Sequence, residues 1–87
     1  MSTKDKLIER FKRQPKDFTF DELKTMLYGL GFDMSSKGKT SGSRVRFQNG
    51  IERIDVHKPH PSNIIKEYKM KETLDFLIKK GFLTMED

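Results

Sequence analysis

Apolar residues recur at helical spacing near the N-terminus of the chain. Within the charged segment 3–13 they share one side of a helix, and they are Leu7, Ile8 and Phe11. Gln14 precedes Pro15, and the residue before a proline is driven out of helical geometry, so the segment ends there. The pattern predicts a short amphipathic helix.

A second helix has a clearer beginning. Thr19 stands three residues before Glu22, the spacing of a capping box in which the two side chains satisfy each other's free backbone amides. The apolar residues that follow again recur at three- and four-residue spacing, and they are Leu23, Met26, Leu27 and Leu30. Gly31 tolerates the left-handed conformation that ends helices. We therefore predict a helix over residues 20–30.

The period changes to two from Phe32 onward. Phe32 and Met34 alternate with polar neighbours, which predicts a first strand, and residues 35–41 have the composition of a loop. Further on, Asn49-Gly50 separates two alternating segments. Asn-Gly in this context favours a β-hairpin, because both residues tolerate positive φ. We expect the hairpin over residues 43–57.

A two-residue turn at Asn49-Gly50 would fix the register of this hairpin. The expected pairs across the two strands are Gln48 with Ile51, Arg46 with Arg53, Val45 with Ile54, and Arg44 with Asp55. One face would carry the apolar side chains Val45, Phe47, Ile54 and Val56. The other would carry Arg44, Arg46, Arg53, Asp55 and His57.

A last helix follows a polar connection over residues 58–67. Its apolar stripe is Met70, Leu74, Leu77 and Ile78, and Gly81 ends it. The order is helix, helix, three strands, helix. We predict an α+β fold in which a three-stranded antiparallel sheet carries helices on one face and leaves the other face open.

Composition narrows the class of protein. A chain of 87 residues is long enough for one domain, and its seven phenylalanines supply a core although hydrophobic residues make up only 33%. It has no cysteine and two histidines, so we expect no disulfide, metal or cofactor. Charged residues interrupt the N-terminus, and no apolar run reaches the ~20 residues of a membrane span. We expect a cytoplasmic protein without a membrane partner.

The predicted polar face of the hairpin is a candidate phosphate site. The net charge of +5 favours a polyanionic partner. Three arginines share the face, Arg44, Arg46 and Arg53, with Lys37, Lys39 and Lys58 beside them in the sequence. Arginine binds phosphate through a planar fork of donors, and an anion would relieve the repulsion between two opposed arginines. The alternative is a solvated face that only keeps the protein in solution.

Both histidines lie in one short segment, His57-Lys58-Pro59-His60-Pro61. An imidazole titrates near neutral pH, so it can accept a proton from a ribose 2′-hydroxyl or return one to a leaving oxygen. Beside arginines that stabilise charge on the phosphate, the pair is typical of metal-independent RNA cleavage. The alternative is a rigid proline turn with two exposed imidazoles.

The segment from Asp17 to Leu83 resembles a HicA toxin. The resemblance rests on motifs in a common order, namely Phe20-Asp21-Glu22-Leu23, Leu30-Gly31-Phe32, Thr40-Ser41-Gly42-Ser43-Arg44, His57-Lys58-Pro59-His60-Pro61 and Ile78-Lys79-Lys80-Gly81. It divides the chain into an N-terminal helical extension, residues 1–16, and a toxin domain, residues 17–87.

This resemblance implies a fold similar to double-stranded-RNA-binding domains, an mRNA-cleaving ribonuclease activity, and a HicB-type antitoxin as protein partner. Family members usually carry a catalytic histidine after Gly-Ser, where this chain has Arg44. Arginine cannot act as a general base near neutral pH. Either His57 or His60 moves the proton, with Arg44 holding the phosphate, or the chain binds RNA without cleaving it. The RNA-binding candidates are Lys39, Ser43, Arg44, Arg46, Arg53 and Lys58.

Two alternatives to the ribonuclease stay open. One is a non-catalytic RNA-binding module with the same fold. The other is a protein-interaction domain whose basic face docks an acidic partner.

Overall fold

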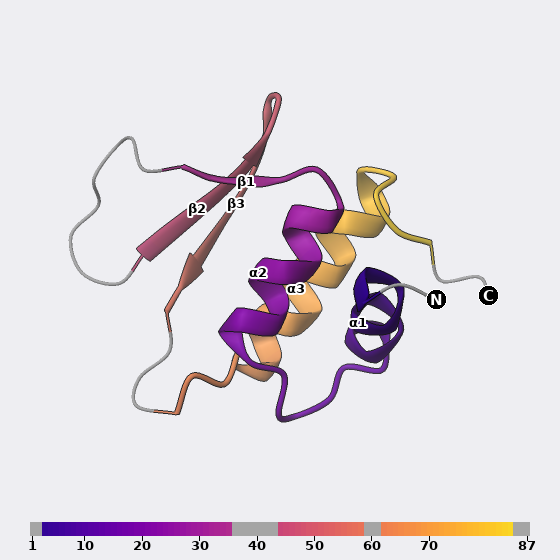
Figure 1. Cartoon of the computed structure of the whole chain (residues 1–87), viewed down its shortest axis with the longest axis vertical. Coiled ribbons are helices and arrows are strands. Elements are labelled where there is room, and N and C mark those ends of the chain that lie inside the picture. Colours follow the sequence, from indigo (N-terminus) through magenta and orange to yellow (C-terminus); the bar gives the residue numbers. More distant parts are fainter. Residues whose placement is uncertain (1–2, 36–43, 59–61, 85–87) are drawn as a thin grey trace.

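The chain folds into a three-stranded sheet with helices on one side. The computed structural model describes residues 3–35, 44–58 and 62–84. Its elements are α1 (Thr3–Lys12), α2 (Phe20–Gly29), β1 (Asp33–Ser35), β2 (Arg44–Asn49), β3 (Glu52–His57) and α3 (Glu67–Lys79). The sheet is antiparallel with the strand order β1-β2-β3. Figure 1 shows α2 and α3 beside the sheet and α1 beyond them. The predicted α+β architecture is confirmed.

The capping box at the start of α2 is confirmed. Thr19 Oγ1 accepts a hydrogen bond from the Glu22 amide at 3.1 Å, and Glu22 Oε1 accepts one from the Thr19 amide at 2.9 Å. The same carboxylate oxygen lies 2.8 Å from Arg10 Nη1, which ties α1 to the beginning of α2. One glutamate thus serves both a helix end and a helix–helix contact.

Helices α2 and α3 end in the same way. Gly31 has φ +98°, and the next amide, of Phe32, donates to Leu27 O at 2.9 Å, which is the Schellman arrangement that satisfies free carbonyls at a helix end. The same pattern recurs at the end of α3, where Phe82 N donates to Leu77 O at 2.8 Å. The Phe32 and Phe82 rings then pack against each other with centroids 4.8 Å apart. This contact joins the ends of α2 and α3.

Helix α1 shares the core with the other helices. Phe11 is fully buried, and its ring centroid lies 5.4 Å from that of Phe18, which precedes α2. Gln14 Nε2 donates to Met70 O of α3 at 3.3 Å. The division into an extension and a toxin domain stays a prediction, but the part that the structure describes has one continuous core.

The expected register of the hairpin is wrong by two residues. Asn49 is paired with Glu52, so the turn is Gly50-Ile51. Gly50 has φ +63°, and a turn that requires a positive φ only at its first central position is of the II′ kind, where Gly is favoured. The predicted Asn49-Gly50 turn, in which both residues have positive φ, is therefore not formed.

All the expected cross-strand pairs change with this register. The observed pairs are Arg44 with His57, Val45 with Val56, Arg46 with Asp55, Phe47 with Ile54 and Gln48 with Arg53. A shift of two residues leaves every side chain on its predicted face. Phe47, Ile54 and Val56 are buried as predicted, whereas Val45 is only half-buried and lies opposite Val56.

The first strand also departs from the pattern in part. Phe32 is buried just before β1 begins, and Met34 within it keeps 38% of its surface exposed. Met34 is paired with Phe47 at the edge of the sheet. Met34 thus lies in a three-residue strand at the edge of the sheet.

Candidate nucleic-acid interface

The open face of the sheet carries the candidate site. Alternation along the strands turns Phe47, Ile54 and Val56 toward the helices, and the residues between them toward solvent. We call the solvent-facing side the open face. Its side chains in the described part of the chain are Asp33, Arg46, Gln48, Arg53, Asp55 and His57.

Arg46 does not face a second arginine. It lies opposite Asp55, with Arg46 Nε 2.8 Å from Asp55 Oδ1. The hydrogen bond to Asp55, and then the Coulombic attraction of the carboxylate, raise the pKa of Arg46 above its ordinary value. The predicted repulsion between Arg46 and Arg53, which an anion was to relieve, is therefore absent. Arg46 keeps its charge, but a carboxylate already occupies part of its donor fork.

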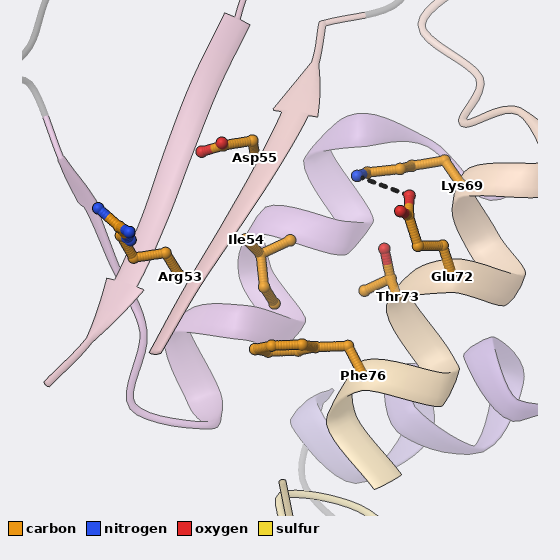
Figure 2. A pocket seen from close by; sticks show the side chains of 7 residues that line it. All are labelled: Arg53, Ile54, Asp55, Lys69, Glu72, Thr73 and Phe76. Carbon is orange, nitrogen blue, oxygen red and sulfur yellow. Dashed lines mark hydrogen bonds and ion pairs between the residues drawn. The ribbon is translucent and has the colours of Figure 1, made fainter. Parts of the chain in front are cut away.

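Arg53 is the exposed cation of this face. It lies opposite the neutral Gln48, and no ion pair involves its guanidinium within residues 3–35, 44–58 and 62–84. Figure 2 shows Arg53 and Asp55 directed to one side of β3, and Ile54 to the other side, toward α3. A guanidinium without a carboxylate partner has all its donors available for a phosphate.

His57 lies at the last position of β3, opposite the backbone of Arg44 at the first position of β2. The side chain of His57 is exposed on the open face. In the described part of the chain it has no hydrogen-bond partner that fixes its ring orientation. The structure thus brings His57 onto the same face as Arg46 and Arg53, as the sequence predicted.

Lys58 extends away from this group. Its Nζ lies 5.9 Å from the centre of the Phe20 ring at the start of α2. Alternation after His57 also directs Lys58 to the helical side of the sheet. A ligand that contacts both Lys58 and the open face would therefore have to pass around the open end of the hairpin, where β3 ends.

The remaining candidates cannot be placed. Lys37, Lys39, Ser43 and His60 lie outside the described residues. Among the residues described, no group of three or more histidine, cysteine, aspartate or glutamate side chains is arranged to hold a metal ion. Nor is any helix of the described part long and apolar enough to cross a bilayer.

The comparisons with known proteins give no relative. No protein-family model, no curated protein and no solved structure matches this chain. Any functional assignment therefore depends on the residues and their geometry.

Sequence reasoning missed a cleft on the side of β3 that faces α3. It has a volume of about 280 Å³ and is lined by Arg53, Ile54, Asp55, Lys69, Glu72, Thr73 and Phe76. Thr73 occupies a buried position in the stripe of α3, between Met70 and Leu77. A polar residue at a core position of an amphipathic helix was the available signal, because buried hydroxyls normally have hydrogen-bond partners.

Proposed function

We propose that this chain is an RNA-directed toxin of the HicA type, which cleaves mRNA in the cytoplasm and is neutralised by a HicB-type antitoxin. The proposed fold type is that of double-stranded-RNA-binding domains, with the open sheet face as the RNA surface. The observation that carries the proposal is the presence of Arg46, Arg53 and His57 together on that face.

Each of the three residues has a role in the proposed reaction. Arg53 binds the phosphate through its free guanidinium, and Arg46 adds positive charge beside it. His57 accepts the proton of the ribose 2′-hydroxyl, and the 2′-oxygen attacks the adjacent phosphorus. The bond from phosphorus to the 5′-oxygen of the next nucleotide breaks, and that oxygen takes up a proton as it leaves. His60 is the second candidate for proton transfer. Arg44 is proposed to hold the phosphate, with Lys39, Ser43 and Lys58 as further RNA contacts.

One observation favours a non-catalytic RNA-binding module as the second candidate. A catalytic base is usually oriented by a third group, and within the described residues His57 has no such hydrogen bond. A protein of this kind would bind RNA through Arg46 and Arg53 and leave it intact.

Induced expression of the wild type and of variants at His57 tests the proposal. We expect growth arrest and mRNA decay with the wild type, and neither when the adjacent antitoxin gene is expressed too. His57→Ala is expected to abolish both effects while RNA binding persists, because loss of a general base costs about 10²–10⁴ in rate. His60→Ala is expected to have the same or a weaker effect.

Lys6→Ala on α1 is the control, since Lys6 is exposed on the helix farthest from the sheet. Arrest and decay that persist in the His57, His60 double variant would exclude the catalytic assignment. RNA binding by the wild type without cleavage in purified form would establish the second candidate instead. Purified protein is assayed in EDTA, so that cleavage reports metal-independent chemistry.

A further inference from the structure

β3 has an unpaired edge. It is the last strand of the sheet, and its partner β2 lies on one side only. In a hairpin with a two-residue turn, the residues that flank the turn exchange both backbone hydrogen bonds, and every second pair beyond them does the same. The backbone groups of Arg53, Asp55 and His57 therefore point away from β2. No other strand in the described part of the chain pairs with this edge.

The cleft of about 280 Å³ opens beside this edge, between β3 and α3. Figure 2 shows Lys69, Thr73 and Phe76 extending from α3 toward β3, and Ile54 extending from β3 toward α3. Ile54 and Phe76 supply apolar surface. Lys69 and Glu72 form an ion pair of 3.0 Å at the cleft.

Thr73 is a buried polar group without a partner in this cleft. It is 2% exposed, and its Oγ1 makes no hydrogen bond within the described residues. Thr73 lines the cleft while its Oγ1 is fully buried, so a ligand atom in the cleft would recover the free energy of the missing hydrogen bond once the Thr73 side chain rotates toward it. This is independent of the strand edge and points to an occupant with a hydrogen-bonding group.

We propose that the cleft and the β3 edge bind an extended peptide segment of a partner protein, added as a fourth strand with alternating side chains. Every second side chain of such a strand enters the cleft against Ile54 and Phe76, with one polar side chain next to Thr73. The others lie on the open face beside Arg53 and His57. Because Arg53 has no carboxylate partner among the described residues, the outward side chain that lies opposite Arg53 is acidic.

A second copy of this chain fits the edge less well. Antiparallel pairing of two β3 strands about Asp55 would put the two Asp55 carboxylates directly opposite each other and Arg53 opposite His57. Like charges that face each other across strands are destabilising. Pairing about Ile54 would instead bring Arg53 opposite an Asp55 that Arg46 already holds at 2.8 Å. A strand from another protein with an acidic side chain opposite Arg53 supplies a carboxylate that no second cation shares.

The probe is a capped seven-residue peptide, Glu-Val-Glu-Thr-Glu-Val-Glu, titrated into the ¹⁵N-labelled full chain. We expect saturable shifts of the amides of residues 53–57 and 69–76. The matched peptide with lysine in place of each glutamate should bind at least about threefold more weakly at low salt. Absence of binding at millimolar peptide, or shifts confined to α1 or β1, would overturn the proposal.

N-methylation of the peptide backbone tests strand addition itself. If the added strand is antiparallel, the glutamate amides face β3, and methylating them should weaken binding at least about tenfold. If it is parallel, methylating the valine and threonine amides should do so. Equal binding of both methylated peptides and the parent would show that no strand pairing occurs.

Two variants of the chain test the residues named. Arg53→Glu should weaken binding of the acidic peptide and strengthen binding of the lysine peptide. Lys6→Glu changes the net charge equally and should leave the binding of both peptides unchanged. Wild type should prefer the threonine peptide over its valine analogue by about fivefold, and Thr73→Val should lose that preference. Unchanged preferences in both variants would overturn the assignment of the cleft.

The proposal does not depend on RNA cleavage, because the probe contains no nucleic acid. Sedimentation of the free chain is measured alongside. A dimer that the peptide dissociates would mean that a second copy occupies the edge, which contradicts the proposal. Displacement of RNA by the peptide is not required, and a chain that fails to cleave RNA still gives every readout above.

Discussion

Arg46 and Asp55 face each other across β2 and β3, with Arg46 Nε 2.8 Å from Asp55 Oδ1. Both side chains are partly exposed, at 36% and 45%. An ion pair at this exposure stabilises a fold little, so its main effect is on the charge that the open face presents. The carboxylate reduces the attraction of Arg46 for a phosphate. Arg53, farther along β3, has no such neighbour among the described residues.

Replacing Asp55 by asparagine should therefore increase RNA affinity. Asp55→Asn keeps the shape of the side chain and removes one negative charge beside Arg46. With a short single-stranded oligoribonucleotide, we expect tighter binding at low salt. The log–log salt slope should become more negative by about 0.7 if Arg46 gains one phosphate. Fluorescence anisotropy over a salt series measures both quantities.

Asp75→Asn is the control for net charge. Asp75 is exposed on α3, on the side where Pro15 and Tyr68 lie, so it is remote from the open face. If Asp75→Asn increases RNA affinity as much as Asp55→Asn does, the effect is one of overall charge. The open face would then have no special part in binding.

The two-residue shift of the hairpin shows that the sequence pattern predicts the face of a side chain but not its partner on the next strand. Alternation decides which face a side chain takes, and a shift of two residues changes no face. The pattern therefore predicted correctly that Arg46 and Arg53 share a face. It could not decide whether Arg46 lies opposite Arg53 or Asp55. The observed turn removes the opposition of like charges and pairs Phe47 with Ile54, both buried.

Gly50 is the residue on which this turn depends. It has φ +63°, and no atom outside Gly50 and its two chain neighbours lies within 4 Å of the position that a Cβ would take. The expected cost of Gly50→Ala is therefore conformational, about 1 kcal/mol of unfolding free energy. Gly50→Asn should cost less, because asparagine tolerates the left-handed region better. Urea unfolding of both variants measures the difference, and equal stability of Gly50→Ala and wild type would contradict the turn geometry.

Helix ends were predicted well because their signals are local. The capping box at Thr19 and the glycine stops at Gly31 and Gly81 each act within one turn of the chain. The cleft at Thr73 was not predicted, because it depends on how α3 lies against β3, far away in the sequence. The position of Lys58 over the Phe20 ring is another such long-range contact.

The packing of α1 gives a test of the predicted domain division. Phe11 is fully buried against Phe18, whereas Leu7 is only half-buried. Phe11→Ala should lower the unfolding free energy by about 3–5 kcal/mol, and Leu7→Ala by clearly less. Chemical denaturation followed by circular dichroism measures both. A Phe11→Ala variant as stable as wild type would mean that residues 1–16 are a dispensable extension.

The two arginines of the open face should differ in their contribution to RNA binding. Arg53 has a free guanidinium in the described part of the chain, so Arg53→Ala should make the salt slope less negative by about 0.7. Arg46→Ala should change the slope by less, because Asp55 already neutralises Arg46. In the Asp55→Asn background, Arg46→Ala should have the larger effect. Lys6→Ala removes the same charge from α1 and should leave the slope unchanged. Equal slopes for Arg53→Ala and Lys6→Ala would show that RNA does not contact the open face at Arg53. An RNA affinity that does not depend on salt would show that the chain makes no phosphate contacts.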